Sequence, residues 1–148
     1  AMVQRDPPSA TLFETDETAW LEQTTALIRD GRFGEIDRET LAEYLSDMAK
    51  RDRREVFNRL VMLMVHLLKW DYQPDRRSGS WRGTIREQRR ELRQLLESGT
   101  LENHARVVWT EAYTEAREQA ADETELDITV FPAVCPWDLE AAMGTAES

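Results

Sequence analysis

Seven arginines and two tryptophans gather in one short segment of this chain, residues 66–93. Arginine binds carboxylates and phosphates through a planar fork of N–H donors, and tryptophan offers a flat apolar surface beside it. The whole chain has a formal net charge of −10, so this segment reverses the local charge. Such a reversal indicates either a site for an anion or an acidic partner, or a set of ion pairs that holds helices together.

The strongest candidate site surrounds the start of a predicted helix in this segment. Arg76 and Arg77 precede that start, which Ser78 or Ser80 can cap. A helix start presents free N–H groups and the positive end of the helix dipole, and both attract anions. The residues that we predict to bind an acidic protein or an anionic small molecule are Lys69, Trp70, Tyr72, Arg76, Arg77, Trp81, Arg82, Arg86 and Arg89.

A structural role for the arginines is the first alternative. Acids of neighbouring helices, such as Glu55, Glu111 or Glu115, could pair with them, because bidentate arginine–carboxylate pairs commonly fix how helices pack. The tryptophans would then belong to the core. In that case the cluster would be purely structural, and any partner would bind elsewhere.

An enzymatic role is the second alternative. His66 and Lys69 lie one turn apart on the more polar side of a predicted helix, and with Arg77 they could act on a phosphorylated small molecule. The sequence places no nucleophile or second acid near them. A buried histidine bonded to its own backbone is the commoner arrangement, so we favour a non-enzymatic binding module.

Metal, cofactor and thiol chemistry find little support. Cys135 is the single cysteine, which excludes an internal disulfide and leaves no cysteine pair for zinc, as is usual in a reducing cytoplasm. Its neighbours are apolar, so we expect a buried, unreactive thiol. The two histidines, His66 and His104, lie on separate predicted helices, and no Gly-rich phosphate loop occurs. We therefore expect neither a metal nor a cofactor.

Helical periodicity dominates the elements that must position these residues. Residues 56–70 are apolar around nearly the whole circumference of a helix, which is typical of a helix in the middle of a bundle. The polar run Lys50–Arg54 favours a bend or short break before this central helix. After the last long helix, the β-branched stretch Ile128–Phe131 predicts an extended arm, and Pro136 is expected to open a short helix to Met143. We expect Phe131 and Trp137 to dock this arm on the bundle. The five main helices are expected at about residues 16–30, 37–50, 56–70, 78–97 and 101–121.

These elements predict an all-α fold: a single-domain bundle of about five helices around a central apolar helix, with a C-terminal extended arm and a short last helix. A chain of 148 residues is the size of one domain. We expect a disordered tail over 1–10, in which Ala1 before Met2 reads as a cloning remnant, and a helical domain over 11–148.

Composition also restricts the partners. The longest nearly unbroken apolar run, residues 60–68, is much shorter than the ~18 residues that a membrane span needs, so we expect no membrane partner. A pI near 4.7 disfavours nucleic acid, because most of the surface repels phosphate. We expect a cytoplasmic protein, and the sequence leaves homo-oligomerisation open.

Three motifs carry a resemblance to a known family. They are the run HLLKWDYQPDRRSGSWRGTIREQRREL, the upstream Arg53–Glu55 (RRE) and the downstream FPAVCPWDLE at Phe131–Glu140. Together they resemble the bacterial family called domain of unknown function 29, over about residues 12–143. The resemblance implies a small all-helical fold, and it implies no activity and no catalytic residues.

Overall fold

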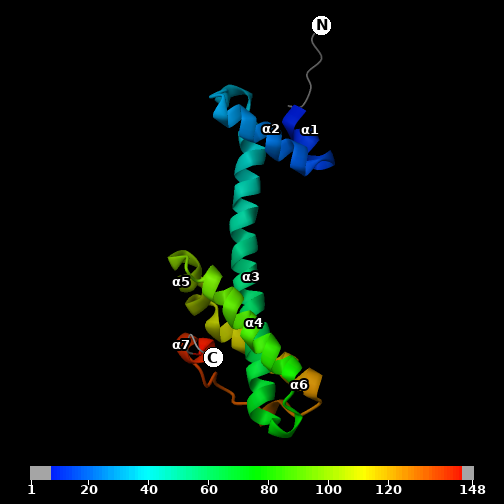
Figure 1. Cartoon of the computed structure of the whole chain (residues 1–148), viewed down its shortest axis with the longest axis vertical. Coiled ribbons are helices and arrows are strands. Elements are labelled where there is room, and N and C mark those ends of the chain that lie inside the picture. The colour runs from blue at the N-terminus through cyan, green and yellow to red at the C-terminus, as the bar shows by residue number, and fades with distance from the viewer. Residues whose placement is uncertain (1–7, 145–148) are drawn as a thin grey trace. The chain divides into compact units, whose positions relative to one another are not determined.

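The computed structural model describes residues 8–144, and this part of the chain contains helices and no strands (Figure 1). The predicted all-α class is therefore confirmed, although this part of the chain has seven α-helices where about five and a short last helix were expected. The helices are α1 (Pro8–Thr15), α2 (Glu17–Arg29), α3 (Arg38–Tyr72), α4 (Gly79–Leu95), α5 (Gly99–Val107), α6 (Trp109–Thr124) and α7 (Leu139–Met143). Three short 3-10 turns connect them: η1 (Phe33–Glu35), η2 (Pro74–Arg76) and η3 (Ile128–Val130).

The chain divides into two compact units, one ending at Lys50 and one beginning at Arg51. The expectation of one domain over 11–148 therefore stays a prediction. Of the tail expected at 1–10, residues 1–7 lie outside the described residues, and residues 8–10 belong to α1. In the described part of the chain we find no helix with the length and apolar character needed to span a membrane.

The first unit is built around three aromatic rings. Trp20 of α2 is fully buried, and its ring centroid lies 5.0 Å from that of Phe13 and 5.7 Å from that of Tyr44. Asp16 caps α2 by accepting a hydrogen bond from the backbone N–H of Ala19, 3.0 Å away. Helix α2 is followed by Gly31, whose φ of +73° is the left-handed conformation that glycine adopts at low cost. Helix α2 therefore starts and stops close to the residues that the sequence predicts.

The second unit packs around the second half of α3. Leu60, Leu63, Met64 and Leu68 are fully buried there, as expected for a helix that is apolar on all sides. In Figure 1, α4 and α6 lie along this half of α3. Helix α6 can pack closely because it presents alanines to the core, and these are fully buried: Ala112, Ala116 and Ala120. Helix α4 adds Ile85 and Leu92 to the same core.

The C-terminal arm, residues 125–143, is fixed to this unit by side chains that donate to its backbone. The hydroxyl of Tyr113 donates to the carbonyl oxygen of Pro132 at 2.5 Å, and the indole N–H of Trp109 donates to that of Trp137 at 3.0 Å. Arg117 donates to the carbonyl oxygen of Phe131, whose ring is almost fully buried. The arm is thus docked by Phe131 and the partly buried Trp137, as we expected from the sequence.

Two predicted helix boundaries were wrong. We expected a break near Lys50–Arg54, but α3 is continuous through this run, because its Lys and Arg residues have good helix propensity and no Gly or Pro interrupts them. The helix expected at 101–121 is divided into α5 and α6 at Val108. Two adjacent β-branched residues, Val107 and Val108, weaken the helix at that point.

The structure of the arm also differs from the prediction. The stretch expected to be extended contains the 3-10 turn η3, because Asp127 accepts hydrogen bonds from the backbone N–H and the hydroxyl of Thr129 at 2.9 and 2.7 Å. The last helix begins at Leu139, three residues after Pro136. Asp138 determines this start by accepting a hydrogen bond from the N–H of Ala141 at 2.8 Å.

We predict that the second half of α3 carries much of the stability of the second unit. Leu63→Ala should lower the free energy of unfolding by about 2 to 5 kcal/mol, because the substitution leaves a cavity in a fully buried position. Leu45→Ala on the same helix is the matched control, since Leu45 is 57% exposed and should cost about 0.5 kcal/mol or less. Urea unfolding followed by circular dichroism measures both values. Equal losses in the two variants would contradict this placement of the core.

Candidate anion-binding site

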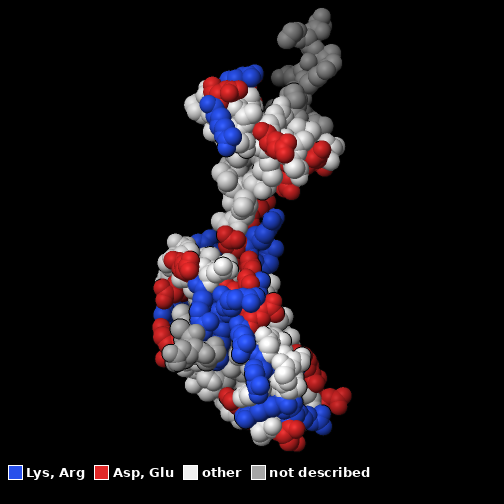
Figure 2. Space-filling model, viewed as in Figure 1, with Lys and Arg blue, Asp and Glu red and all other residues white. Residues whose placement is uncertain are grey.

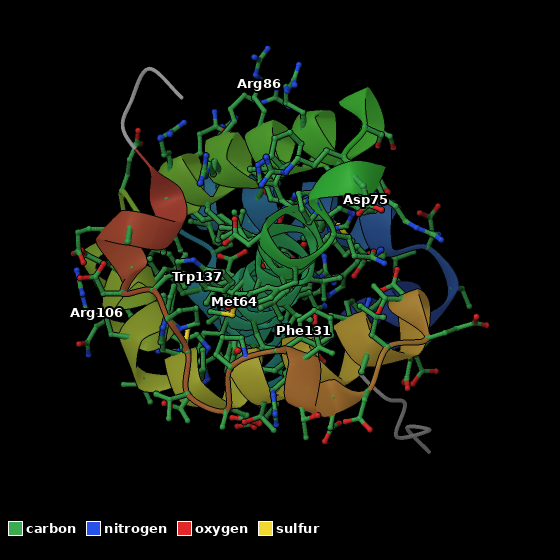
Figure 3. All side chains as sticks on the ribbon, turned by 90° about the horizontal axis from the view of Figure 1, so that it is seen from below. Met64, Asp75, Arg86, Arg106, Phe131 and Trp137 are labelled. Carbon is green, nitrogen blue, oxygen red and sulfur yellow. The ribbon has the colours of Figure 1, made fainter. Side chains whose placement is uncertain are left out.

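A pocket of about 470 Å³ opens in the second unit, where the end of α3, the helix α4 and the C-terminal arm meet. The two tryptophans in its wall, Trp70 and Trp137, come from opposite ends of this unit's sequence. Figure 3 shows Trp137 on the arm and Arg86 on α4, with the Arg86 side chain extending outward, so Arg86 stands at the rim. The lining residues are Leu67, Trp70, Asp71, Arg82, Ile85, Arg86, Arg89, Trp137 and Ala141.

Three arginines of α4 face this pocket, since Arg82, Arg86 and Arg89 follow one another at helical spacing. Within the described residues, none of the three has a carboxylate within 4 Å. The guanidinium carbon of Arg82 lies 5.6 Å from the ring centroid of Trp70, a cation–π contact that leaves its N–H donors available. Arg82 and Arg86 are exposed, so both can reach an anion that enters from solvent.

Arg89 and Arg93 bind the end of α7. The Nε of Arg89 donates to the carbonyl oxygen of Ala142 at 2.9 Å, and a terminal nitrogen of Arg93 donates to that of Met143 at 3.1 Å. These carbonyls belong to the last turn of a helix, where they lack partners in the helix and the dipole attracts cations. Burial lowers the pKa of Arg89, and repulsion from Arg93 lowers it further. The two arginines therefore hold the arm that forms one wall of the pocket.

One acid lines the pocket beside these cations. Asp71 lies in the last turn of α3, and its carboxylate forms no hydrogen bond or ion pair with any described residue. Burial raises the pKa of Asp71, and the charge of Arg77 partly opposes that change. The pocket thus contains unpaired groups of both signs.

Several predicted site residues surround the pocket without lining it. The Nε of Arg77 donates to the carbonyl oxygen of Trp70 at 2.8 Å. The guanidinium carbon of Arg77 also lies 4.8 Å from the ring centroid of Trp70, so Arg77 packs against the C-terminal end of α3. Tyr72 packs edge-to-face on Phe131 with 5.7 Å between centroids. Arg76 is exposed on η2, and its guanidinium group forms no ion pair or hydrogen bond with a described residue.

Lys69 is buried and paired. Its Nζ donates to a carboxylate oxygen of Glu123 at 2.9 Å and lies 5.7 Å from the ring centroid of Trp81. Burial opposes ionisation of Glu123, but hydrogen bonds from Lys69 and Gln119 outweigh it and hold the pKa of Glu123 below its ordinary value. The Nδ1 of His66 lies 2.8 Å from the carbonyl oxygen of Met62 in the same helix. The pocket lining includes neither His66 nor Lys69 nor Arg77, which the enzymatic alternative requires.

The structure therefore brings together four of the predicted site residues, namely Trp70, Arg82, Arg86 and Arg89. Sequence reasoning missed the other groups in the wall. Trp137 was expected to dock the arm, but no spacing in the sequence placed it opposite the arginines. Asp71 stands between two aromatic residues that we selected, and its position at a helix end was the available signal.

Ion pairs between helices are few among the described residues of this unit. Arg59 pairs with Glu55 at 2.9 Å and lies 3.9 Å from Glu91 of α4, so Glu55 does form an arginine pair, but with its own helix. Neither Glu111 nor Glu115, which the structural alternative invoked, has an arginine within 4 Å in this part of the chain. The arginines of α4 that are bonded rely mainly on carbonyl oxygens.

The remaining chemical candidates are the thiol of Cys135 and the side chains that could bind a metal ion. Burial raises the pKa of the Cys135 thiol, and its Sγ lies 3.3 Å from the carbonyl oxygen of Trp137. Over residues 8–144, His, Cys, Asp and Glu side chains form no group of three or more that could hold a metal ion.

The fold and the pocket define a small all-helical protein with a basic, aromatic-walled cavity. The family model described as Domain of unknown function DUF29 matches residues 12–146. This match covers most of the chain, so the protein belongs to that family and the resemblance found in its motifs is confirmed. No curated protein and no solved structure matches the chain.

We predict that Arg89 and Arg93 hold α7 in place. In the double variant Arg89→Gln/Arg93→Gln, the last carbonyls of α7 lose charged donors, and each such hydrogen bond contributes about 1.5 to 3 kcal/mol. Amide hydrogens of residues 139–143 should then exchange faster with solvent, which hydrogen exchange measures directly. Arg90→Gln, on the same helix, should leave this exchange unchanged. Unaltered protection in the double variant would show that α7 is held in place by other contacts of the arm.

We also predict that the native thiol reacts slowly. The thiolate is the reactive form of cysteine, and burial raises the pKa of Cys135, so the thiol stays protonated at neutral pH. Maleimide labelling at pH 7 should be much slower in the native protein than in urea. Equally fast labelling of the two states would contradict the packing of this residue.

Proposed function

We propose that this protein is a non-enzymatic binding module that captures an anionic small ligand in the pocket between α4 and the C-terminal arm. The observation that carries the proposal is the position of Arg82 and Arg86, which line one cavity and have no carboxylate partner among the described residues. A cluster of cations without counter-ions is unfavourable unless an anion joins it. The ligand would supply that anion.

The walls support a ligand with an apolar part. Leu67, Ile85 and Trp137 present hydrocarbon and ring surface in the same pocket as the rim arginines. A volume of about 470 Å³ lies within the roughly 300 to 1,000 Å³ that small-molecule sites occupy. A benzene ring with a short carboxylate-bearing chain meets both requirements.

An acidic protein partner is the second candidate. Figure 2 shows lysine and arginine side chains gathered over α4, on a chain whose net charge is −10. Arg76 and Arg90 are exposed and do not line the pocket. An acidic peptide would contact them as well as the rim arginines, whereas a pocket ligand would not.

The experiment compares two double variants that remove the same charge. Arg82→Gln/Arg86→Gln removes the pocket cations, and Arg76→Gln/Arg90→Gln removes two exposed cations beside it. Titration calorimetry with 3-phenylpropionate should show binding to the native protein that weakens by about tenfold or more in the first variant, because each charged hydrogen bond contributes about 1.5 to 3 kcal/mol. The second variant should bind within about twofold of the native protein.

Three further measurements complete this test. The neutral analogue 3-phenylpropanamide should not bind, and added salt should weaken binding of the carboxylate. A polyglutamate peptide that loses affinity equally in both double variants, with no binding of 3-phenylpropionate, would favour the acidic partner. If no carboxylate or acidic peptide binds the native protein, the proposal is wrong.

A further inference from the structure

The pocket contains an unpaired carboxylate that an anion-binding role does not explain. Asp71 lines the same cavity as Arg82 and Arg86, yet none of these arginines approaches its carboxylate within 4 Å in the described structure. A ligand that carries only negative charge would be repelled by Asp71. The chemical groups that this aspartate attracts are ammonium groups and other hydrogen-bond donors.

The position of Asp71 is itself unfavourable to the fold. It is the second-last residue of α3, and a negative charge at the C-terminal end of a helix opposes the helix dipole. Its side chain is accessible to solvent, although partial desolvation by the surrounding protein raises its pKa. Arg77 lies near enough to affect this carboxyl group, but Arg77 is bonded to the carbonyl oxygen of Trp70 and does not pair with it. Among the described residues, the carboxylate of Asp71 therefore has no hydrogen bond or ion pair that would stabilise the fold.

Opposite charges and an apolar wall in one cavity define a chemical class of ligand. We propose that the pocket binds a small zwitterion with an apolar side chain, an amino acid or a dipeptide. Its carboxylate lies at Arg82 and Arg86, its ammonium group lies at Asp71, and its apolar side chain packs against Trp137 and Ile85. This inference rests on the proposed function, because the same arginines hold the carboxylate.

The two charged positions together give selectivity. A carboxylate without an amine leaves Asp71 unpaired beside it, and an amine without a carboxylate leaves the arginines unpaired. An uncharged ligand of the same shape leaves both unpaired. Only a ligand with both groups gives an oppositely charged partner to the arginines and to Asp71 at once, so each charge contributes to discrimination as well as to affinity.

The test uses two matched pairs of probes. Phenylalanine is compared with 3-phenylpropionate, and phenylalanyl-alanine is compared with N-(3-phenylpropanoyl)-alanine, so that within each pair only the ammonium group differs. The first pair places the two charges on one carbon, and the second places them one residue apart. Titration calorimetry on the native protein should show at least one zwitterion binding about tenfold or more tightly than its deaminated partner.

The substitution Asp71→Asn should abolish that preference and should leave the affinity for the deaminated probe unchanged or improved. Circular dichroism should be unaltered, because the amide has the same shape and removes an unfavourable charge from the helix end. Asp75→Asn is the matched control, because Asp75 is exposed on η2 outside the pocket lining, and it should keep the full preference.

The outcomes separate the two proposals. Equal or tighter binding of both deaminated probes to the native protein would overturn the zwitterion inference and leave the anion site intact. Preference for a zwitterion that survives in Asp71→Asn would also overturn it. Absence of binding by all four probes would overturn both proposals.

Discussion

The second unit depends on one constraint: the second half of α3 is apolar around most of its circumference, so only a narrow strip with Asn58 and Met62 can remain in water. Burying each apolar side chain contributes roughly 1.5 to 3 kcal/mol, and this helix requires neighbours on most of its sides to obtain it. Helices α4 and α6 lie along it, and the arm brings Phe131 and Leu139 into the same core. The arm must reach back across the unit to do so. That return is what places Trp137 opposite the arginines and closes the pocket.

The arginines of α4 divide into two groups with different chemistry. Those near the start of the helix, Arg82 and Arg86, face solvent and a cavity, whereas Arg89 and Arg93 are bonded to the backbone of α7. The arginines of α4 are therefore neither all parts of an anion site nor all members of ion pairs between helices. Carbonyl oxygens at a helix end are acceptors that no pattern of Asp and Glu in the sequence can reveal. One arginine stripe serves both the docking of the arm and the polar rim of the pocket.

The sequence predicted the features that local chemistry determines. The Ser78 cap of α4, the Asp37 cap before α3 and the turn at Gly31 all occur where side-chain hydrogen bonding or backbone freedom requires them. Predictions failed where two local tendencies compete, as at Val108 and Asp127. The candidate site was predicted in part, because the arginine stripe is a property of one helix. Trp137 joined it only through the return of the arm, and Asp71 joined it because the end of α3 lies beside α4. Periodicity cannot indicate either of these contacts.

The attachment of the C-terminal arm has a consequence for how its sequence can change. Most of its hydrogen-bond acceptors are main-chain carbonyls, which every amino acid supplies: those of Phe131, Pro132, Trp137, Ala142 and Met143. The carboxylate of Glu140, which accepts from Arg106 at 2.6 Å, adds one side-chain acceptor. The donors to the carbonyls, in contrast, are particular side chains on α4 and α6. Substitutions in the arm can therefore alter the pocket wall while the attachment persists. Such substitutions can therefore change which ligand the pocket prefers, while the helices that hold the arm keep their sequence and their packing.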